Sequence, residues 1–196
     1  MGVKQGIAGA VLKTTRWNLI VEKRPPRTGS IMLGVPHTSY FDGVLMICIA
    51  WSLDLDIKWL GKKALFKAPL GWITRPLGGI PVNRGNAGGM VQELVTDLNG
   101  RAAEGHPGGW ALVITPEGTR SKRDYWKSGF YRIATETGLP VVLGFVDRRN
   151  RTTGLGPTLQ MTGDPKADMD RIREFYKGKV GVRPGLEGPP KLRMED

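Results

Sequence analysis

The chain has 196 residues, which is enough for one domain with a sizeable core, and its 40% hydrophobic and 24% charged residues are typical of globular proteins. Its 29 Lys and Arg against 18 Asp and Glu give a net charge of +11, which favours polyanionic partners: nucleic acid, anionic lipid headgroups or small phosphorylated ligands. The single cysteine, Cys48, excludes an internal disulfide and a multi-cysteine zinc site. Because there are only two histidines, His37 and His106, we expect no His-rich metal site. We also expect no bound cofactor.

Residues 1–24 are predicted to form an amphipathic helix that ends at two consecutive prolines, residues 25–26. Basic residues lie among its apolar positions, which are Val3, Ile7, Val11 or Leu12, Trp17 and Ile20 or Val21. A basic amphipathic helix that carries a tryptophan can lie in a membrane interface. The alternative, which the sequence leaves open, is a helix that packs on its own domain.

A polar loop separates two apolar runs and contains the first candidate site. Residues 30–35 are predicted to form a buried strand, and residues 43–51 a helix with Asp42 as its N-cap. His37 leaves the strand end, and a carboxylate brought back onto an imidazole fixes its tautomer and leaves the other nitrogen free to take a proton. The pair is the base and orienter of a catalytic triad without a nucleophile. The alternative is a structural histidine beside an ordinary helix cap.

The middle of the chain is predicted to contain a strand at residues 55–60, a helical turn at 62–67 and a short strand at 78–84 that ends in Arg84. Between the last two lies an apolar segment, residues 68–77, with two prolines. If its Leu, Trp and Ile side chains are exposed, they can meet lipid. If they are buried, they line a groove or fill a core, which is the commoner outcome.

A second polar loop follows the next predicted strand. A helix with one apolar face begins at residue 90, and residues 110–114 form the strand. The loop after it, residues 115–121, contains Glu117 and Arg120 around Gly118, which permits a tight backbone turn. His106 is expected in a solvent-facing loop.

The last third is predicted to contain a helix that ends at Gly138, a buried strand at residues 139–146, a further strand at 156–163 and a helix at 167–177. Residues 181–196 are rich in Gly, Pro and charge and are expected to form a flexible tail.

Strands that alternate with helices predict an α/β fold: a single layered domain with a largely parallel central sheet flanked by helices. We divide it into the helix 1–24, a main domain 25–180 and the tail 181–196. Because ligand loops gather at strand ends in such domains, His37, Arg84 and Glu117 are expected to converge on one site. The longest apolar run, residues 43–53, is well short of the roughly 20 residues of a membrane-spanning helix.

Four motifs occur in a fixed order: His-x-x-x-x-Asp at His37, Gly-Ile-x-Val-Asn-Arg ending at Arg84, Pro-Glu-Gly-Thr-Arg-Ser around Glu117, and an apolar Pro-Val-Val strand from Pro140. Together they resemble the glycerolipid acyltransferases, specifically the 1-acylglycerol-3-phosphate acyltransferase family, over about residues 30–147. The resemblance implies transfer of a fatty acyl group from acyl-CoA or acyl-carrier protein to the hydroxyl of lysophosphatidate. It also implies a peripheral enzyme at the cytoplasmic face of an anionic membrane.

The resemblance implies roles for individual side chains. His37 is the general base and Asp42 orients it. The third motif, which includes Thr119, and the Arg of the second motif bind the glycerol phosphate acceptor. The acceptor-site candidates are Arg84, Glu117, Gly118, Thr119, Arg120 and Lys127, of which Arg120 and Lys127 fall where a cation can neutralise phosphate. Backbone amides after His37 are the expected oxyanion donors.

The sequence departs from the family pattern beside these motifs. Pro36 stands where Asn is usual, Thr115 where Phe is frequent, Pro81 where an aromatic is common, and Gly144 where a second proline is usual. Another lysophospholipid or an aminolipid hydroxyl is therefore an alternative acceptor. A non-catalytic basic lipid-binding module is the alternative from another class. Nucleic acid is not an expected partner, because the positive charge is scattered and no DNA- or RNA-binding signature is present.

Overall fold

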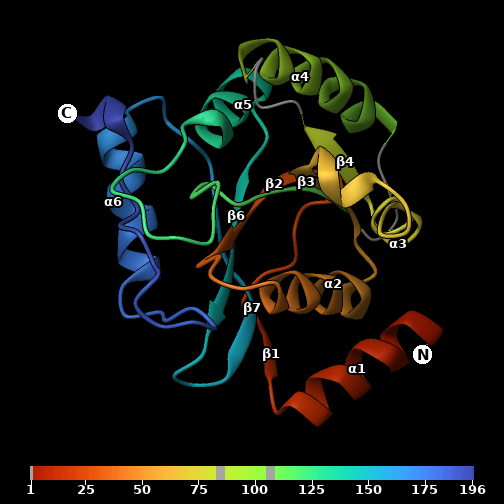
Figure 1. Ribbon diagram of the computed structural model, residues 1–196. Helices are drawn as coiled ribbons and strands as arrows, with labels where there is room; N and C mark the ends of the chain where they lie inside the picture. Colours follow the sequence, from red (N-terminus) through yellow and green to blue (C-terminus); the bar gives the residue numbers. More distant parts are fainter. Residues whose placement is uncertain (1, 83–86, 105–108) are drawn as a thin grey trace.

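The computed structural model describes residues 2–82, 87–104 and 109–196, and its centre is a seven-stranded sheet (Figure 1). The strands are β1 (Asn18–Val21), β2 (Ser30–Val35), β3 (Asp56–Lys62), β4 (Gly79–Val82), β5 (Trp110–Ile114), β6 (Val141–Asp147) and β7 (Thr152–Leu159). Their order across the sheet is β1-β7-β6-β2-β5-β3-β4, and every neighbouring pair is parallel except β6 and β7. The predicted α/β class with a largely parallel sheet is confirmed.

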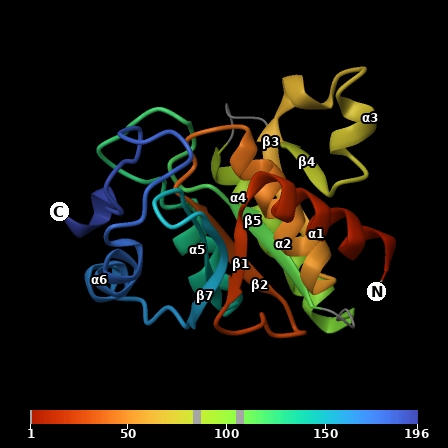
Figure 2. The same ribbon diagram turned by 90° about the horizontal axis from the view of Figure 1, so that it is seen from below.

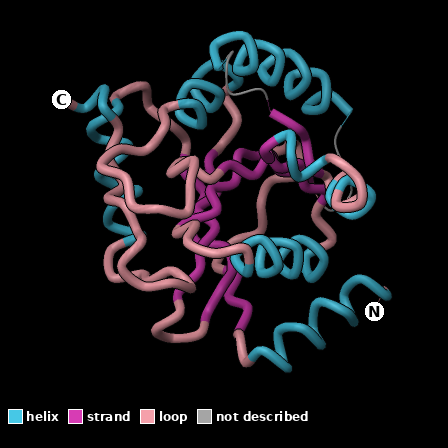
Figure 3. The backbone as a smooth tube through the Cα atoms, in the orientation of Figure 1, coloured by secondary structure: helices cyan, strands magenta, loops and turns pink. Residues whose placement is uncertain are grey.

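Helices cover both faces of the sheet (Figures 1 and 2). They are α1 (Val3–Thr15), α2 (Phe41–Leu53), α3 (Gly71–Thr74), α4 (Ala87–Glu104), α5 (Gly129–Thr137) and α6 (Pro165–Tyr176), with short 3₁₀ turns η1 (Lys63–Phe66) and η2 (Arg193–Glu195). Side chains of α4, α5 and α6 share one core cluster with β2, β5 and β6, whereas α2 packs on the opposite face and α1 packs outside α2. The tube in Figure 3 shows long loops on the side of the molecule where the C-terminus lies.

The central strand β2 shows why the sequence forms this core. Its side chains alternate between the two faces: Ile31, Leu33 and Val35 join the cluster under α4, α5 and α6, and Met32 joins the cluster under α2. Both faces of β2 are buried, so the strand reads as a continuous apolar run, as parallel strands commonly do.

Helix α2 is apolar around its whole circumference because it lies between two layers. Ile49 and Leu53 pack toward the sheet, while Leu45 and Cys48 pack against α1. A helix that is apolar on all sides is normally buried, as this one is. The apolar run at residues 43–53 therefore lies mostly in the core, with Val44 exposed. Within the described residues no helix is long and apolar enough to span a membrane.

The N-terminal prediction is wrong in its extent. The helix ends at Thr15, Arg16 adopts a left-handed conformation with φ 58°, and residues 18–21 form β1, which pairs with β7. Trp17 is buried and its ring packs near that of Phe41, with 6.3 Å between ring centroids. The spacing of Ile20 and Val21 fitted a continued helix only by coincidence.

The prediction of a loose C-terminal tail is also wrong. Leu192 is fully buried in the main core cluster, and its backbone forms a parallel bridge with Trp126. Glu195 accepts a hydrogen bond from the Arg173 guanidinium at 2.6 Å, which ties η2 to α6. The strand predicted at 156–163 is β7, which begins and ends earlier.

Candidate functional site

His37 lies in the loop between β2 and α2, at the edge of the sheet where β2 ends. Its Nδ1 is 3.5 Å from Oδ2 of Asp42, and its side chain is 25% exposed. The contact is longer than an ordinary hydrogen bond, and such contacts are often long before substrate binds. The predicted pair of imidazole and carboxylate is therefore brought together, with Nε2 as the nitrogen that does not face Asp42.

The Asp42 carboxylate is held by the loop that carries His37. Oδ2 accepts the N–H groups of Thr38 and Ser39, both at 2.6 Å. The predicted N-cap role is wrong: Tyr40 is the N-cap, and Asp42 lies in the first turn of α2, where the helix dipole favours a negative charge. Its Oδ1 is buried and has no hydrogen-bond partner among the described residues, so it retains acceptor capacity for the nearby imidazole.

Glu117 joins the loop after β5 to the loop after β2. Its two carboxylate oxygens accept the backbone N–H of His37 at 3.1 and 3.0 Å. The pKa of Glu117 is raised to about 8, mainly by burial and also by the charges of Asp42 and Glu187, while the His37 hydrogen bond opposes the shift. The Glu117 carboxyl is thus mostly neutral at pH 7, and it accepts a hydrogen bond from the His37 backbone N–H.

Gly118 and Lys127 lie against each other beside Glu117. Gly118 has φ +67°, and its N–H donates to the Thr115 carbonyl at 3.0 Å, which closes a tight turn. A Cβ at Gly118 would lie 2.7 Å from Cε of Lys127, so the lysine stem occupies the space that a side chain would need. The Lys127 N–H donates to the Pro116 carbonyl at 2.8 Å, and the side chain is exposed.

Arg120 contacts the His37 loop directly. Its guanidinium carbon lies 3.5 Å from the centroid of the Tyr40 ring, a cation–π contact between the second polar loop and the first. Thr119 instead makes a contact within its own loop, since its Oγ1 accepts the Ser121 N–H at 3.4 Å. Arg84 and His106 lie outside the described residues.

Sequence reasoning missed the contribution of the C-terminal segment. The Arg183 N–H donates to Oγ1 of Thr38 at 2.9 Å, and a Cβ at Gly181 would lie 2.5 Å from that same oxygen. Glu187 accepts the N–H groups of Gly181 and Gly185, both at 2.7 Å, and so folds this segment over the His37 loop. No local motif signals a contact between residues so distant in the sequence.

Several of the backbone amides expected as oxyanion donors have hydrogen-bond partners within the protein. The N–H of His37 donates to Glu117, those of Thr38 and Ser39 donate to Asp42, and that of Phe41 donates to the Ser39 hydroxyl at 2.9 Å. These amides hold the loop and are not free for a substrate. Among the described residues, no group of three His, Cys, Asp or Glu side chains is arranged to hold a metal ion.

Comparison with known proteins relates this chain to others. A family model described as Acyltransferase matches residues 19–142, more than half of the chain. The fold is similar to the crystal structure of the 1-acyl-sn-glycerophosphate (LPA) acyltransferase PlsC from Thermotoga maritima, with a TM-score of 0.54, 16% sequence identity, and coverage of 82% of this chain and 68% of that one. The sequences of curated proteins gave no match.

Proposed function

The chain belongs to the acyltransferase family, and we propose that it transfers a fatty acyl group from acyl-CoA or acyl-carrier protein to the hydroxyl of lysophosphatidate. The observation that carries the proposal is the His37 imidazole, partly exposed at a strand end and 3.5 Å from a buried Asp42 carboxylate. The Thermotoga maritima protein of similar fold is a 1-acyl-sn-glycerophosphate (LPA) acyltransferase, which supports the choice of acceptor.

In this mechanism Nε2 of His37 takes the proton of the acceptor hydroxyl as its oxygen attacks the thioester carbonyl carbon. The C–O bond forms, the C–S bond breaks, and the proton passes from His37 to the departing thiolate. Asp42 holds the imidazole in orientation and stabilises its protonated form. The acceptor supplies the attacking oxygen, so no serine or cysteine nucleophile is required.

Cationic side chains beside His37 provide for a phosphate on the acceptor. We assign this role to Arg120, which contacts the His37 loop through Tyr40, and to Lys127, whose exposed ammonium group follows the Gly118 turn. Arg84 keeps the role that the motif implies for it. Glu117 acts in our proposal as a positioning residue, because both of its carboxylate oxygens accept the His37 N–H.

The test is thiol release by purified protein supplied with acyl-CoA or acyl-carrier protein and a panel of lysophospholipids, compared with His37→Ala. Because a positioned base contributes about 10²–10⁴ in rate, we expect His37→Ala to lower kcat by that factor while its circular dichroism is unchanged. The other histidine provides a matched control, and His106→Ala should retain full activity. Equal rates in wild type and His37→Ala would exclude His37 as the base.

The acceptor panel decides between the remaining alternatives. A preference for lysophosphatidate supports the proposed acceptor, and a preference for another lysophospholipid or an aminolipid keeps the chemistry and changes the substrate. An absence of turnover with both donor classes would favour the non-catalytic lipid-binding module.

A further inference from the structure

We propose that the segment from Lys62 to Arg75, which contains η1 and α3, is the surface through which this protein docks on an anionic lipid bilayer. Three observations support it: apolar side chains are exposed, the segment beneath them is anchored to the fold, and the charged side chains along the segment are all positive. The inference deepens the proposed function by naming the surface that meets the lipid, and vesicle binding tests it without turnover.

The apolar residues of α3 and its N-cap, Leu70, are exposed. Leu70 is 52%, Trp72 77% and Ile73 61% exposed, within one turn of chain. Single exposed apolar residues are common, but a cluster of large ones marks an interaction surface. Tryptophan favours membrane interfaces in particular, because its ring is apolar while its N–H remains hydrated.

This exposure does not come from a loose loop, because the other side of the segment is anchored. Phe66 is buried and packs near Trp59, with 5.8 Å between ring centroids. A Cβ at Gly71 would lie 2.4 Å from the Phe66 carbonyl oxygen, so the start of α3 fits closely onto η1. The Thr74 hydroxyl donates to the Leu65 carbonyl at 2.9 Å. The fold therefore holds the outward side chains in place.

The charge along this segment of the chain has one sign, although Asp54 and Asp56 border a cavity together with Arg75. Residues 57–92 contain no Asp or Glu. Lys62, Lys63, Lys67 and Arg75 are exposed, and none of them forms an ion pair within the described part of the chain. A basic apolar surface complements anionic headgroups above an acyl layer.

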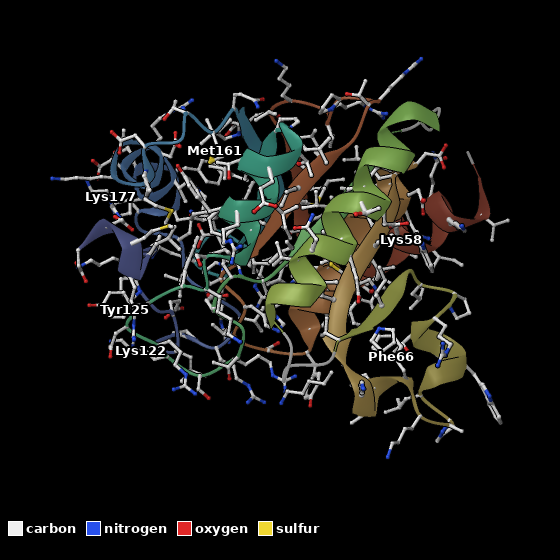
Figure 4. All side chains as sticks on the ribbon, turned by 90° about the horizontal axis from the view of Figure 1, so that it is seen from above. Lys58, Phe66, Lys122, Tyr125, Met161 and Lys177 are labelled. Carbon is white, nitrogen blue, oxygen red and sulfur yellow. The ribbon has the colours of Figure 1, made fainter. Side chains whose placement is uncertain are left out.

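The docking surface lies on the same edge of the sheet as the candidate site. Strands β2, β5 and β3 are parallel neighbours, so His37 after β2 and Lys63 after β3 leave the sheet at the same edge. Figure 2 shows α3 and the loop between β5 and α5 on one side of the molecule, and Figure 4 shows Phe66 and Lys122 toward that side. A bilayer against α3 would thus present lipid acceptors on the side where His37 lies.

Helix α1, the other membrane candidate, has most of its apolar face occupied. Ala8 and Leu12 are buried in the cluster that contains Leu45 and Cys48 of α2. Val3 and Ile7 remain exposed at its N-terminal end, and Lys4 borders a cavity of about 200 Å³ together with Arg75. The α1 residues are therefore a comparison set in the experiment.

The experiment is sedimentation with phosphatidylcholine vesicles, with and without added phosphatidylglycerol. Trp72→Ser/Ile73→Ser should lower partitioning of the full chain about tenfold or more on mixed vesicles, because two interfacial side chains are lost. Lys63→Glu/Lys67→Glu should lower it by roughly fivefold or more per lysine, and only when phosphatidylglycerol is present. Matched controls on the far side, Met194→Ser (49% exposed) and Lys177→Glu, should bind as wild type.

Three results would overturn the inference: no binding of the wild type to mixed vesicles, wild-type binding by the Trp72 and Ile73 variant, or loss only in Val3→Ser/Ile7→Ser. A lysine variant that binds vesicles normally but loses turnover with acyl-carrier protein would assign the charge to an acidic protein partner instead.

Thiol release with a water-soluble acceptor separates this inference from the proposed function. If the Trp72 and Ile73 variant keeps that activity and loses vesicle binding, the segment acts in membrane docking and not in catalysis. If the wild type binds vesicles but shows no turnover with any substrate, the proposed acyl transfer is refuted and the docking surface is not.

Discussion

Two carboxylates hold the His37 loop, and they differ in the groups that they contact. Asp42 contacts the imidazole at 3.5 Å and accepts two amides of the loop, so it acts on both the side chain and the backbone. Glu117 accepts only the His37 amide from within this loop, and its burial favours the protonated form. Neutral Glu117 avoids a second buried negative charge next to Asp42.

The raised pKa of Glu117 predicts a pH dependence of stability. The pKa of this carboxyl is ordinarily 4.5 and is raised to about 8 in the folded chain. Between these values the folded state binds one more proton than the unfolded state, so this group lowers the free energy of unfolding as pH rises from 4.5 to 8. Glu117→Gln cannot ionise and still offers one oxygen to the His37 N–H. Urea unfolding should show a flatter pH dependence in this variant than in wild type.

The control for this prediction is Glu174→Gln, an exposed carboxylate on α6 whose removal should leave the slope unchanged. Equal slopes for wild type and Glu117→Gln between pH 5 and pH 8 would show that Glu117 is ionised in the folded protein throughout.

At the level of elements, the spacing of apolar residues predicted the buried strands and amphipathic helices, because an element that packs on the core needs apolar residues at regular positions. It failed at both ends of the chain. Residues 18–21 are a short edge strand whose pairing with β7 is non-local. Leu192 is one apolar residue among Gly, Pro and charge, so no pattern reveals its burial.

In the candidate site, too, local sequence patterns were predictive and contacts between distant residues were not. The order of the motifs, and the rule that ligand-binding loops follow the ends of parallel strands, identified His37, Asp42, Glu117 and Arg120 as site candidates. The structure brings their loops together. The bonds that position them, such as Arg183 to Thr38, join distant residues and depend on the tertiary fold. The hydrogen-bond partners of the backbone amides in the His37 loop were likewise unpredictable, because they depend on where the fold places the Asp42 and Glu117 carboxylates.

Packing of the C-terminal segment predicts a large effect of a substitution near the end of the chain. Leu192→Ala should lower the free energy of unfolding by about 2–5 kcal/mol, since it leaves a cavity in the main core cluster. Met194→Ala, two residues on and half-exposed, should change it by less than about 0.5 kcal/mol. Thermal and urea unfolding measure both. Similar small effects in the two variants would mean that the segment is detached in solution.

At the scale of the whole molecule, the net charge of +11 acts at a distance while α3 acts at contact. The Debye length is about 30 Å in 0.01 M salt and about 8 Å in 0.15 M salt. At low salt the whole positive field therefore attracts an anionic bilayer, and at physiological salt only the nearby cations of the docking surface contribute. The apolar contact of Trp72 and Ile73 is insensitive to this screening.

These two ranges predict a specific salt dependence of vesicle binding. Wild type should lose part of its partitioning onto vesicles with phosphatidylglycerol between 0.01 and 0.15 M salt and then keep a residual affinity, because the apolar contact remains. Trp72→Ser/Ile73→Ser should bind at 0.01 M salt through charge alone and detach at 0.15 M. Sedimentation across a salt series measures both curves. If they decline in parallel, affinity is purely electrostatic and α3 makes no apolar contact with the bilayer.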